Sequence, residues 1–539
     1  MTADTISNQI NRISNNIELA YSALSDKGAT MPATNNSALL ADTINSISTG
    51  GGGYQEVARY MIDANGAAIA QAGDIDGRFK GITSIANNAM GSAFQNTNIT
   101  GEANFCNCVN VGNDSLASAF SMSNLNVNNP NCLTGVNFCS LINADYGSFT
   151  SAFTNKNFEN NAEINFCNLV NISSWTFYHA FMGSLKNNAT VNFSNLKKAY
   201  TNSFNYAFAD CSGIKTINFN SLENVSGGYY GNSMSYAFSS CGIIELSFPS
   251  LTTIESNLGM ANCFYNNQDL TNAYFPLLNH INRMGMAGTF NRCSNLKTIT
   301  IGTNQIIQNC LHLDMTNATR YSQATSIFQY AFNGTGIERA ILKVPENITT
   351  TSFGYFSTAC TNCLNLVSGQ LYITNKCDVN DYGSVFSNCI NLSSLEIYVQ
   401  GLNSYVANNA FSSCVYGCSN LSTININFLE EGDSGAVSLR NNAFRYAFSN
   451  SKTTGVYVNI NGNITGTGEP FNLFINGCNT SSVDLRNVDI TLSGDIFANM
   501  LAGTDGCTII FNSAEQSTIE GWASYTANFG GTNVTVSFE

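Results

Sequence analysis

The residues of this chain with the most obvious chemical potential are its eighteen cysteines, because thiolates bind metals, form disulfides and act as nucleophiles. Two pairs are closely spaced, Cys106 with Cys108 and Cys360 with Cys363. A zinc site needs a second such pair or nearby histidines. The chain has three histidines, in unrelated sequence contexts: His179, His280 and His312. We therefore expect no metal and no cofactor, and interpret the cysteines and histidines as structural or exposed residues.

Acidic residues suggest no catalytic centre either, because the sequence has no convincing carboxylate pair, nucleophile elbow or phosphate-binding loop. The densest acidic cluster is Glu430, Glu431 and Asp433, which lacks the spacing of a calcium loop. We interpret it as a solvated loop and leave calcium binding open. The protein is expected not to be an enzyme. A polysaccharide depolymerase remains the enzymatic alternative, since it needs only two carboxylates at glycosidase separation.

Several cysteines occupy a fixed place in a repeat, of which residues 206–219 (YAFADCSGIKTINF) are the clearest copy. The copies are about 29 residues apart on average, within the range of solenoid repeats. Fifteen phenylalanines mark them: Phe94, Phe120, Phe153, Phe181, Phe208, Phe238, Phe264, Phe290, Phe332, Phe356, Phe386, Phe411, Phe448, Phe474 and Phe497. The cysteines at the repeat position are Cys211, Cys241, Cys293, Cys389 and Cys414.

Each copy predicts one short strand and one inward-facing turn. The segment that contains Ile214, Ile217 and Phe219 ends in a period-two alternation of apolar and polar residues. This alternation places the apolar side chains on one face of a strand. Phe208 and Cys211 are three residues apart, so one helical or 3₁₀ turn would bury both. One unit is too small to form a core, so stability must come from stacking on its neighbours. The cysteines then form an interior column of thiols.

The pattern Ala-Phe-x-x-Cys-x-x-Leu-x-x-Ile-x-Ile resembles the BspA-like class of leucine-rich repeats over about residues 90–515, most closely over residues 207–426. The resemblance implies a leucine-rich-repeat-like solenoid, an α/β fold with one short parallel strand per repeat, preceded by a small helical region. The early copies without cysteine, the long interval from Phe290 to Phe332 and the segment after Phe448 depart from the pattern.

Outside the repeats, residues 1–49 predict a helical attachment or oligomerisation region. Apolar residues within this region follow the a/d seam spacing of a coiled coil, which favours three or four strands, with a trimer preferred. The alternative is a helix that packs on its own chain. We place a glycine linker at residues 50–53, caps at 54–90 and 516–539, and repeats at 91–515. The seam residues are Ile6, Ile10, Ile13, Ile17, Ala20 and Leu24.

Residues 13–24 (ISNNIELAYSAL) and 27–44 (KGATMPATNNSALLADTI) are similar to N-terminal segments of tail, fibre and other virion-surface proteins of gut bacteriophages. The similarity implies that residues 1–49 attach the chain to other virion proteins. It also accounts for a start, residues 1–10, without the features of a signal peptide, because virions leave by lysis.

The composition also argues against two classes of protein, those that bind nucleic acid and those that span a membrane. Only 10% of residues are charged and the net charge is −14, which disfavours binding of nucleic acid. No stretch of 18 apolar residues predicts a membrane span.

The polar residues that alternate with the buried ones on the strands form the predicted binding surface. Such neutral side chains with an occasional tyrosine suit glycans or mucus-like polymers, through hydrogen bonds and ring stacking, or else they only keep the rod soluble. The surface residues are Lys215, Thr216, Asn218, Lys297, Thr298, Thr300, Ser393, Ser394, Glu396, Tyr398, Thr423 and Asn425.

Together these features predict a homo-oligomeric phage structural protein on the virion surface, a tail or head fibre whose rod binds a host receptor or glycan. The alternatives are an adhesin on the bacterial cell surface and a purely structural virion decoration.

Overall fold

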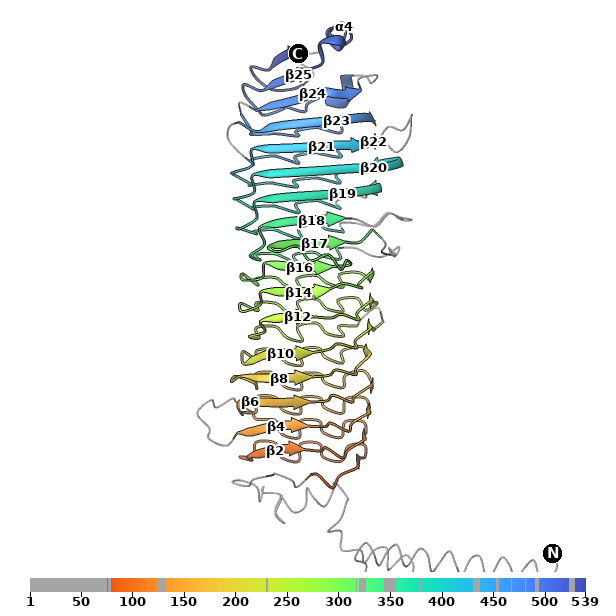
Figure 1. Ribbon diagram of the computed structural model, residues 1–539, viewed down its shortest axis with the longest axis vertical. Coiled ribbons are helices and arrows are strands. Elements are labelled where there is room, and N and C mark those ends of the chain that lie inside the picture. The colour runs from red at the N-terminus through yellow and green to blue at the C-terminus, as the bar shows by residue number, and fades with distance from the viewer. Residues whose placement is uncertain are drawn as a thin grey trace, which may run out of the picture.

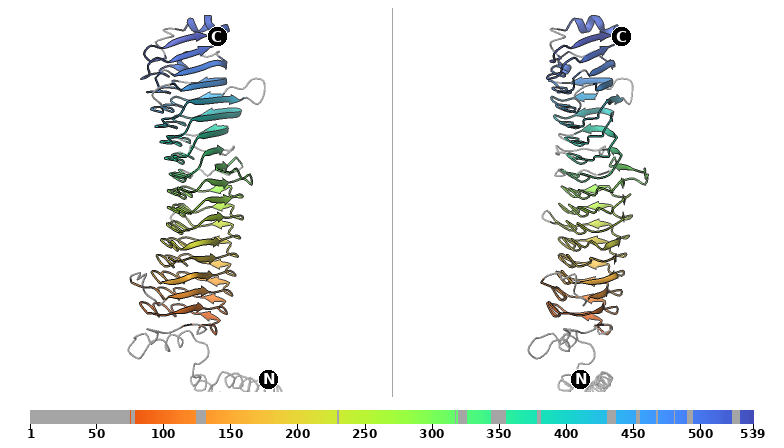
Figure 2. Two further views of the ribbon diagram at one scale, coloured as in Figure 1. Left: turned by 60° about the vertical axis from the view of Figure 1, so that its left-hand side comes forward. Right: turned by 90° about the vertical axis from the view of Figure 1, so that its left-hand side faces the viewer.

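The chain coils into an elongated parallel β-solenoid, in which each turn of the coil adds a strand to one long row (Figure 1). Figure 2 shows the same row from two further sides. The fold predicted from the repeats is thus confirmed. The computed structural model describes residues 75, 79–123, 132–228, 231–316, 318, 326–343, 355–377, 381–429, 437–451, 455–466, 468–479, 481–489, 494–522 and 529–539.

The long row of strands consists of a five-stranded and a thirteen-stranded sheet, and every pairing is parallel. The first sheet contains β2 (Gly101–Asn104), β4 (Leu133–Asn137), β6 (Phe158–Asn165), β8 (Ala189–Asn192) and β10 (Ile214–Asn218). The second contains β12 (Glu245–Ser247), β14 (Asn272–Phe275), β16 (Thr298–Ile301), β17 (Cys310–Asp314), β18 (Arg339–Lys343), β19 (Ser368–Cys377), β20 (Ser394–Val406), β21 (Thr423–Leu429), β22 (Val437–Leu439), β23 (Tyr457–Gly466), β24 (Ser482–Asp489), β25 (Thr508–Phe511) and β26 (Thr535–Phe538).

The N-terminal half has a second, two-residue strand in each turn of the coil, which the sequence pattern did not predict. These strands form two four-stranded parallel ladders. They are β1 (Ser84–Ile85), β3 (Asn110–Val111), β5 (Asn143–Ala144), β7 (Asn171–Ile172), β9 (Lys198–Ala199), β11 (Asn224–Val225), β13 (Thr253–Ile254) and β15 (His280–Ile281). The helices in the described residues are η1 (Gly494–Phe497), η2 (Ser513–Glu515) and α4 (Gln516–Glu520), all close to the C-terminus.

The segment that holds each repeat phenylalanine is a ribbon of consecutive turns, and the predicted helical or 3₁₀ turn is wrong. The backbone N–H groups of Tyr206 and Phe208 donate to the next repeat, at 3.0 and 2.8 Å, whereas those of Ala207 and Ala209 close local turns. Every fourth residue has a positive φ, such as Asn202 with φ 54°. A helix would use all its N–H groups internally, so it would leave the neighbouring repeats without backbone pairing.

Two columns of stacked rings fill the interior beneath these turns. The phenylalanines from Phe94 to Phe332 form one column, with ring centroids such as those of Phe208 and Phe238 5.1 Å apart. A second column runs four residues earlier in each repeat. It holds rings such as Phe328 and Phe356, 5.5 Å apart, and methionines in the three repeats of Met234, Met260 and Met286. Stacked aromatic rings at such distances stabilise each other beyond their burial.

The predicted register is wrong at four of the marker phenylalanines: Phe356, Phe411, Phe474 and Phe497. The ring of Phe497 stacks on that of Phe471, which continues the second column from Phe411 through Phe444. Phe356 and Phe411 belong to the second column, where both rings stack on that of Tyr382. Backbone pairing instead aligns Phe332 with Cys360 and Phe386 with Val415. Phe474 likewise stands one residue before the position that pairs with Phe448. This error in register has a physical reason. Aromatic residues four apart in one repeat lie in two adjacent interior columns, so the sequence pattern alone does not show which column a given phenylalanine occupies.

The cysteine position in each repeat is an interior donor position. The Sγ of Cys211 donates to the carbonyl of Phe181 at 3.0 Å, and that of Cys293 to Phe264 at 3.1 Å. Ser451 makes the same bond to Val415 at 2.9 Å. Burial raises the pKa of Cys211 to about 11 and that of Cys293 to about 12, so these thiols stay protonated donors.

The predicted column of buried thiols is therefore confirmed at Cys211, Cys241, Cys293 and Cys389, all free and buried. Cys414 is also buried, but it lies four residues out of this column, and Cys418 donates there instead, to the carbonyl of Phe386 at 3.0 Å.

The long interval between Phe290 and Phe332 contains an extra strand, β17, inserted between β16 and β18. The two rings still stack at 6.0 Å, so the turn side of the coil gains no additional layer there. Residues 302–309, here called the strap, connect β16 to β17 and pass over the outward face of the sheet, where the backbone N–H of Asn309 donates to Thr298 Oγ1 at 3.2 Å.

The last strand, β26, continues the sheet by pairing with β25, and the ring of Trp522 packs edge-on against Phe511.

Candidate binding surface

The outward face of the sheet has a continuous row of polar and aromatic side chains. Strand register aligns Asp314, Lys343, Tyr372, Tyr398 and Asn427 on consecutive strands from β17 to β21. Parallel pairing without slippage at these positions brings each side chain next to its neighbour. We call this set the outward row.

The charged end of the outward row is a closed ion pair. Lys343 Nζ lies 2.7 Å from Asp314 Oδ2, and it also lies 5.7 Å from the centre of the Tyr372 ring. Burial opposes ionisation of Asp314, but hydrogen bonds from Lys343 and Thr316 outweigh it and lower the pKa of this carboxyl group. The aspartate is therefore held as a charged partner of the lysine and is not a free acid.

The two tyrosines form a stacked pair in the middle of the row. The rings of Tyr372 and Tyr398 are 4.7 Å apart and nearly parallel, at 12°. The Tyr398 hydroxyl donates to Glu396 at 2.9 Å, and the side chain of Gln370 donates to the same oxygen at 2.7 Å. Burial, with the bond to Glu396, raises the pKa of Tyr398 to about 12. The pair presents ring edges and polar groups outward, because one face of each ring is covered by the other.

Beyond the tyrosines the row continues as a ladder of amides. Asn461 donates to Asn427 and Asn487 donates to Asn461, both at 3.0 Å. Next to the ladder, Asp484 accepts from Arg486 at 2.6 Å and from Tyr457 at 2.8 Å. The carboxylates of Asp314, Glu396 and Asp484 thus all have partners.

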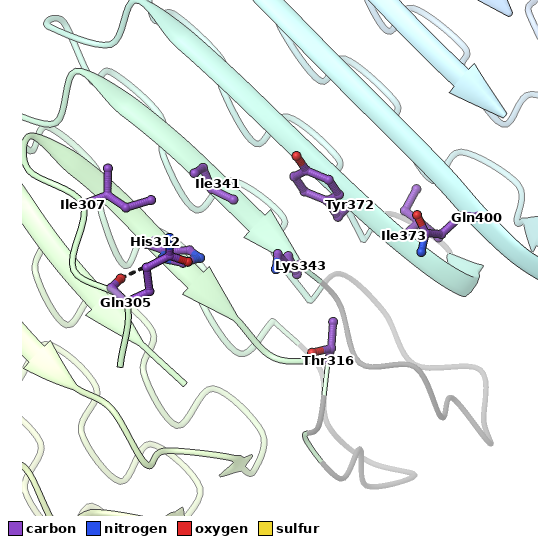
Figure 3. A pocket seen from close by; sticks show the side chains of 9 residues that line it. All are labelled: Gln305, Ile307, His312, Thr316, Ile341, Lys343, Tyr372, Ile373 and Gln400. Atoms are coloured by element: carbon purple, nitrogen blue, oxygen red, sulfur yellow. Dashed lines mark hydrogen bonds between the residues drawn. The ribbon is translucent and has the colours of Figure 1, made fainter. Parts of the chain in front are cut away.

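Two hollows flank the strap on this face. The hollow on the C-terminal side has a volume of about 450 Å³ and lies over β17 to β20. Its lining combines Lys343, His312 and Tyr372 with the amides of Gln305 and Gln400 (Figure 3). The hollow on the N-terminal side measures about 520 Å³ and is lined by Thr216, Glu245, Asn272, Tyr274, Thr298 and Ile306 among others.

His312 anchors the strap. The residue is 3% exposed, and its Nδ1 lies 2.9 Å from the carbonyl oxygen of Gln305. Because the strap crosses the sheet at this point, it separates the two hollows instead of leaving one open groove.

The structure divides the twelve predicted surface residues into four groups. Eight are exposed or half-buried on the strands or their N-terminal ends, as predicted: Thr216, Asn218, Lys297, Ser393, Ser394, Glu396, Thr423 and Asn425. Lys215 is also accessible, but it pairs with Asp269 at 2.7 Å. Thr298 and Thr300 correct the prediction, because the strap buries them to 6% and 1% exposure. Tyr398 is half-buried, and its ring face is occupied by Tyr372 in place of the expected sugar.

Sequence reasoning missed His312, Lys343 and Tyr372, which line the hollow on the C-terminal side. Tyr372 had a usable signal, since it alternates with the buried residues Leu371 and Ile373. His312 had none, because β17 has no copy of the repeat phenylalanine to mark it. Lys343 ends β18, where Ala340, Ile341 and Leu342 are buried in succession, so no alternation marks its outward position.

Within the described residues, no three histidine, cysteine, aspartate or glutamate side chains gather as metal ligands do. His280 is buried and His179 is half-buried on a turn. The acidic cluster of Glu430, Glu431 and Asp433 lies outside the described residues, as do the linker and the whole predicted attachment region. The seam residues therefore remain predictions: Ile6, Ile10, Ile13, Ile17, Ala20 and Leu24.

No family model matches this chain, and no curated protein matches it. Two solved structures align with it at low similarity. The leucine-rich-repeat ectodomain of the receptor kinase GASSHO1/SCHENGEN3 from Arabidopsis thaliana, in complex with CASPARIAN STRIP INTEGRITY FACTOR 2, is 10% identical, with a TM-score of 0.12, over 92% of this chain and 67% of the receptor. The plant peptide hormone receptor RGFR1 in complex with RGF2 is 12% identical, with a TM-score of 0.10, over 85% of this chain and 95% of that one. None of the helices in the described residues is long and apolar enough to cross a membrane.

Proposed function

We propose that the chain is a virion-surface binding protein whose solenoid presents the outward face of its sheet to a host-surface polysaccharide or receptor. The observation that carries the proposal is the hollow beside the strap, where Lys343, Tyr372 and Gln400 come together from three strands of one face. A face that served only solubility would need no such concave site. Attachment to the particle through residues 1–49 is the second half of the proposal and rests on the sequence resemblance.

Recognition on this face would depend on hydrogen bonds more than on ring stacking. The side-chain amides of Gln305 and Gln400 line the hollow, and neither makes a hydrogen bond to another described residue. Unpartnered amides offer both donors and acceptors to sugar hydroxyl groups. The paired carboxylates are not available for acid–base work, so the face supports binding in preference to cleavage.

The proposal is tested with particles whose copy of the chain lacks residues 91–515. We expect intact particles that no longer adsorb to host cells. Unchanged adsorption by fully assembled particles would contradict a host-binding role and favour a structural decoration. Detection of the chain on the bacterial envelope instead of on particles would favour the adhesin.

A finer test addresses the hollow itself. The variant Gln305→Ala/Gln400→Ala removes two amides that support no described contact, so folding should be retained. Adsorption of the labelled full chain to host cells should fall about tenfold or more, the loss expected when two hydrogen bonds to ligand are removed. Gln516→Ala, on the exposed helix α4, is the matched control and should adsorb like the wild type.

A further inference from the structure

A second cluster of aromatic side chains lies away from the sheet, on the turns of three consecutive repeats. Trp175, Tyr178, His179, Tyr206 and Tyr236 are all half-buried, and we call them the turn-face patch. Their ring centroids form an unbroken chain of contacts, at 4.6, 4.0, 5.3 and 4.8 Å in that order. The patch therefore runs along the coil.

The backbone under the patch is unfavourable for such residues. Trp175, His179, Tyr206 and Tyr236 have φ of 64°, 54°, 52° and 54°, in the left-handed region. Bulky side chains are disfavoured there, whereas asparagine and glycine are tolerated. The repeats next to the patch hold small or amide residues at the aligned positions, namely Gly147, Ser151, Asn202, Asn262 and Gly288, whereas Leu258, Met284 and Tyr330 are bulky exceptions further along the coil.

Burial does not explain why large rings occupy these positions, because all four remain partly exposed. Backbone strain that packing does not require is a reason to look for function. Positive φ at bulky residues is therefore not unique to this stretch. What distinguishes it is that its rings contact one another in an unbroken chain, so the aromatic surface itself is the feature to explain.

The chemistry of the patch is polar but uncharged. The hydroxyl groups of Tyr178, Tyr206 and Tyr236 make no hydrogen bond to another described residue. Burial raises the pKa of Tyr206, with Tyr236 and Tyr178 adding to the effect, and burial lowers the pKa of His179. At neutral pH the patch therefore consists of neutral rings and free hydroxyl donors.

The ring orientations provide two kinds of contact. Tyr206 and Tyr236 are parallel, at 4°, so these rings present edges and hydroxyl groups to solvent. The ring of His179 is turned by 70° relative to Tyr206, and Trp175 by 54° relative to Tyr178. A ligand that lies along the patch would thus meet both hydroxyl donors and differently oriented ring faces.

We propose that the turn-face patch is a binding site for a neutral polysaccharide that lies along the coil. The spacing of the rings is close to the length of one sugar unit, and sugars combine apolar C–H faces for aromatic rings with hydroxyl groups for hydrogen bonds. An acidic chain is disfavoured, since the patch has no cation and the protein has a net charge of −14. The site is separate from the hollow on the sheet and does not depend on the function proposed for it.

The first test uses the fluorescence of Trp175. The chain has two tryptophans, so Trp522→Phe leaves Trp175 as the only one, and the new ring keeps the edge-on contact with Phe511. This variant is titrated with four soluble polymers: mannan, dextran, arabinoxylan and, as the acidic member, alginate. A saturable change in Trp175 emission with at least one neutral polymer is expected. No change with any of the three, or a change with alginate alone, would overturn the proposal.

The second test removes the rings without breaking the turns. Tyr206→Asn/Tyr236→Asn places at both sites the residue that Asn262 already provides in the next repeat, so unfolding should occur near the wild-type temperature. Affinity for the neutral polymer should fall at least tenfold.

Tyr330→Asn is the matched control, a tyrosine at the same turn position with φ 53° and no aromatic neighbour in the patch, and it should bind like the wild type. Equal binding by the double variant, or equal loss in the control, would contradict the proposal. Gln305→Ala/Gln400→Ala should keep the Trp175 response, which separates this site from the one on the sheet.

Discussion

At the scale of single residues, Lys156 has the least expected surroundings. It is 1% exposed, and its Nζ donates to the carbonyl oxygens of Thr97 and Ile99, both at 3.2 Å. Burial lowers its pKa from 10.5 to about 8, with the nearby Cys132 thiol opposing the shift. A buried lysine was not predicted from the sequence, although Lys156 occupies the repeat position that cysteine fills elsewhere.

This environment predicts a stability that rises with pH. Below pH 8 both states are protonated and the folded state carries the full cost of the buried ammonium group. Between about pH 8 and 10.5 the unfolded chain binds the extra proton, so stability increases, by about 3 kcal/mol for this group. Guanidinium unfolding midpoints of the wild type and Lys156→Met should therefore diverge over this range, and parallel pH profiles would contradict the assignment.

The thiol column leads to a prediction about which property of cysteine matters. Cys293 donates to the carbonyl of Phe264 inside the core, and Ser451 makes the equivalent bond in its own repeat. Cys293→Ser keeps a donor of similar size. Cys293→Val removes one of the two donors to this carbonyl, the other being Asn267 Nδ2 at 2.9 Å, and should cost about 1 kcal/mol more. Thermal unfolding of both variants measures the difference. If valine is tolerated as well as serine, the position requires only volume.

At the scale of elements, the sequence predicted the strands better than the turns. The alternation of Ile214, Ile217 and Phe219 correctly located β10, because period two has one structural meaning. The Phe-x-x-Cys spacing did not distinguish a helical turn from the observed ribbon, since both place the two side chains inward. The difference lies in N–H groups that pair with the next repeat, and a local pattern does not contain that information.

The ribbon explains why asparagine is frequent on the turns and predicts what replaces it. Asn388 has φ 59° and is exposed, so its side chain contributes little besides tolerance of the left-handed region. Asn388→Gly should change stability by less than about 0.5 kcal/mol, whereas Asn388→Val should cost about 1–2 kcal/mol. Unfolding midpoints of the two variants provide the measurement, and equal midpoints would show that the turn conformation is not limiting.

At the scale of the whole molecule, the inserted strand β17 determines the shape of the candidate surface. The sequence showed the long interval between Phe290 and Phe332, but not that the extra residues would cross the sheet and bury Thr298 and Thr300. The position of the extra residues depends on the pairing of β17 with β16, in which Ile301 lies opposite Leu313. This pairing is a contact between successive turns of the solenoid. The phenylalanine column beneath continues across the insertion, from Phe290 to Phe332, so the core alone does not require it.

That register defines a deletion that removes one strand and the strap together. Without residues 302–313, Ile301 is followed by Asp314, so β16 takes over the pairing of β17 with β18 and the interval between Phe290 and Phe332 returns to ordinary repeat length. We expect a folded chain with its two hollows joined and Thr300 exposed, and a long axis shorter by about 5 Å on the sheet side, one strand spacing. Small-angle scattering measures the length, and labelling of a Thr300→Cys variant by a thiol reagent measures the exposure, with the same substitution in the full-length chain as the control. Rapid labelling in the full-length chain would show that the strap does not cover the sheet, and aggregation of the deleted chain would show that β17 is needed to join the two halves of the solenoid.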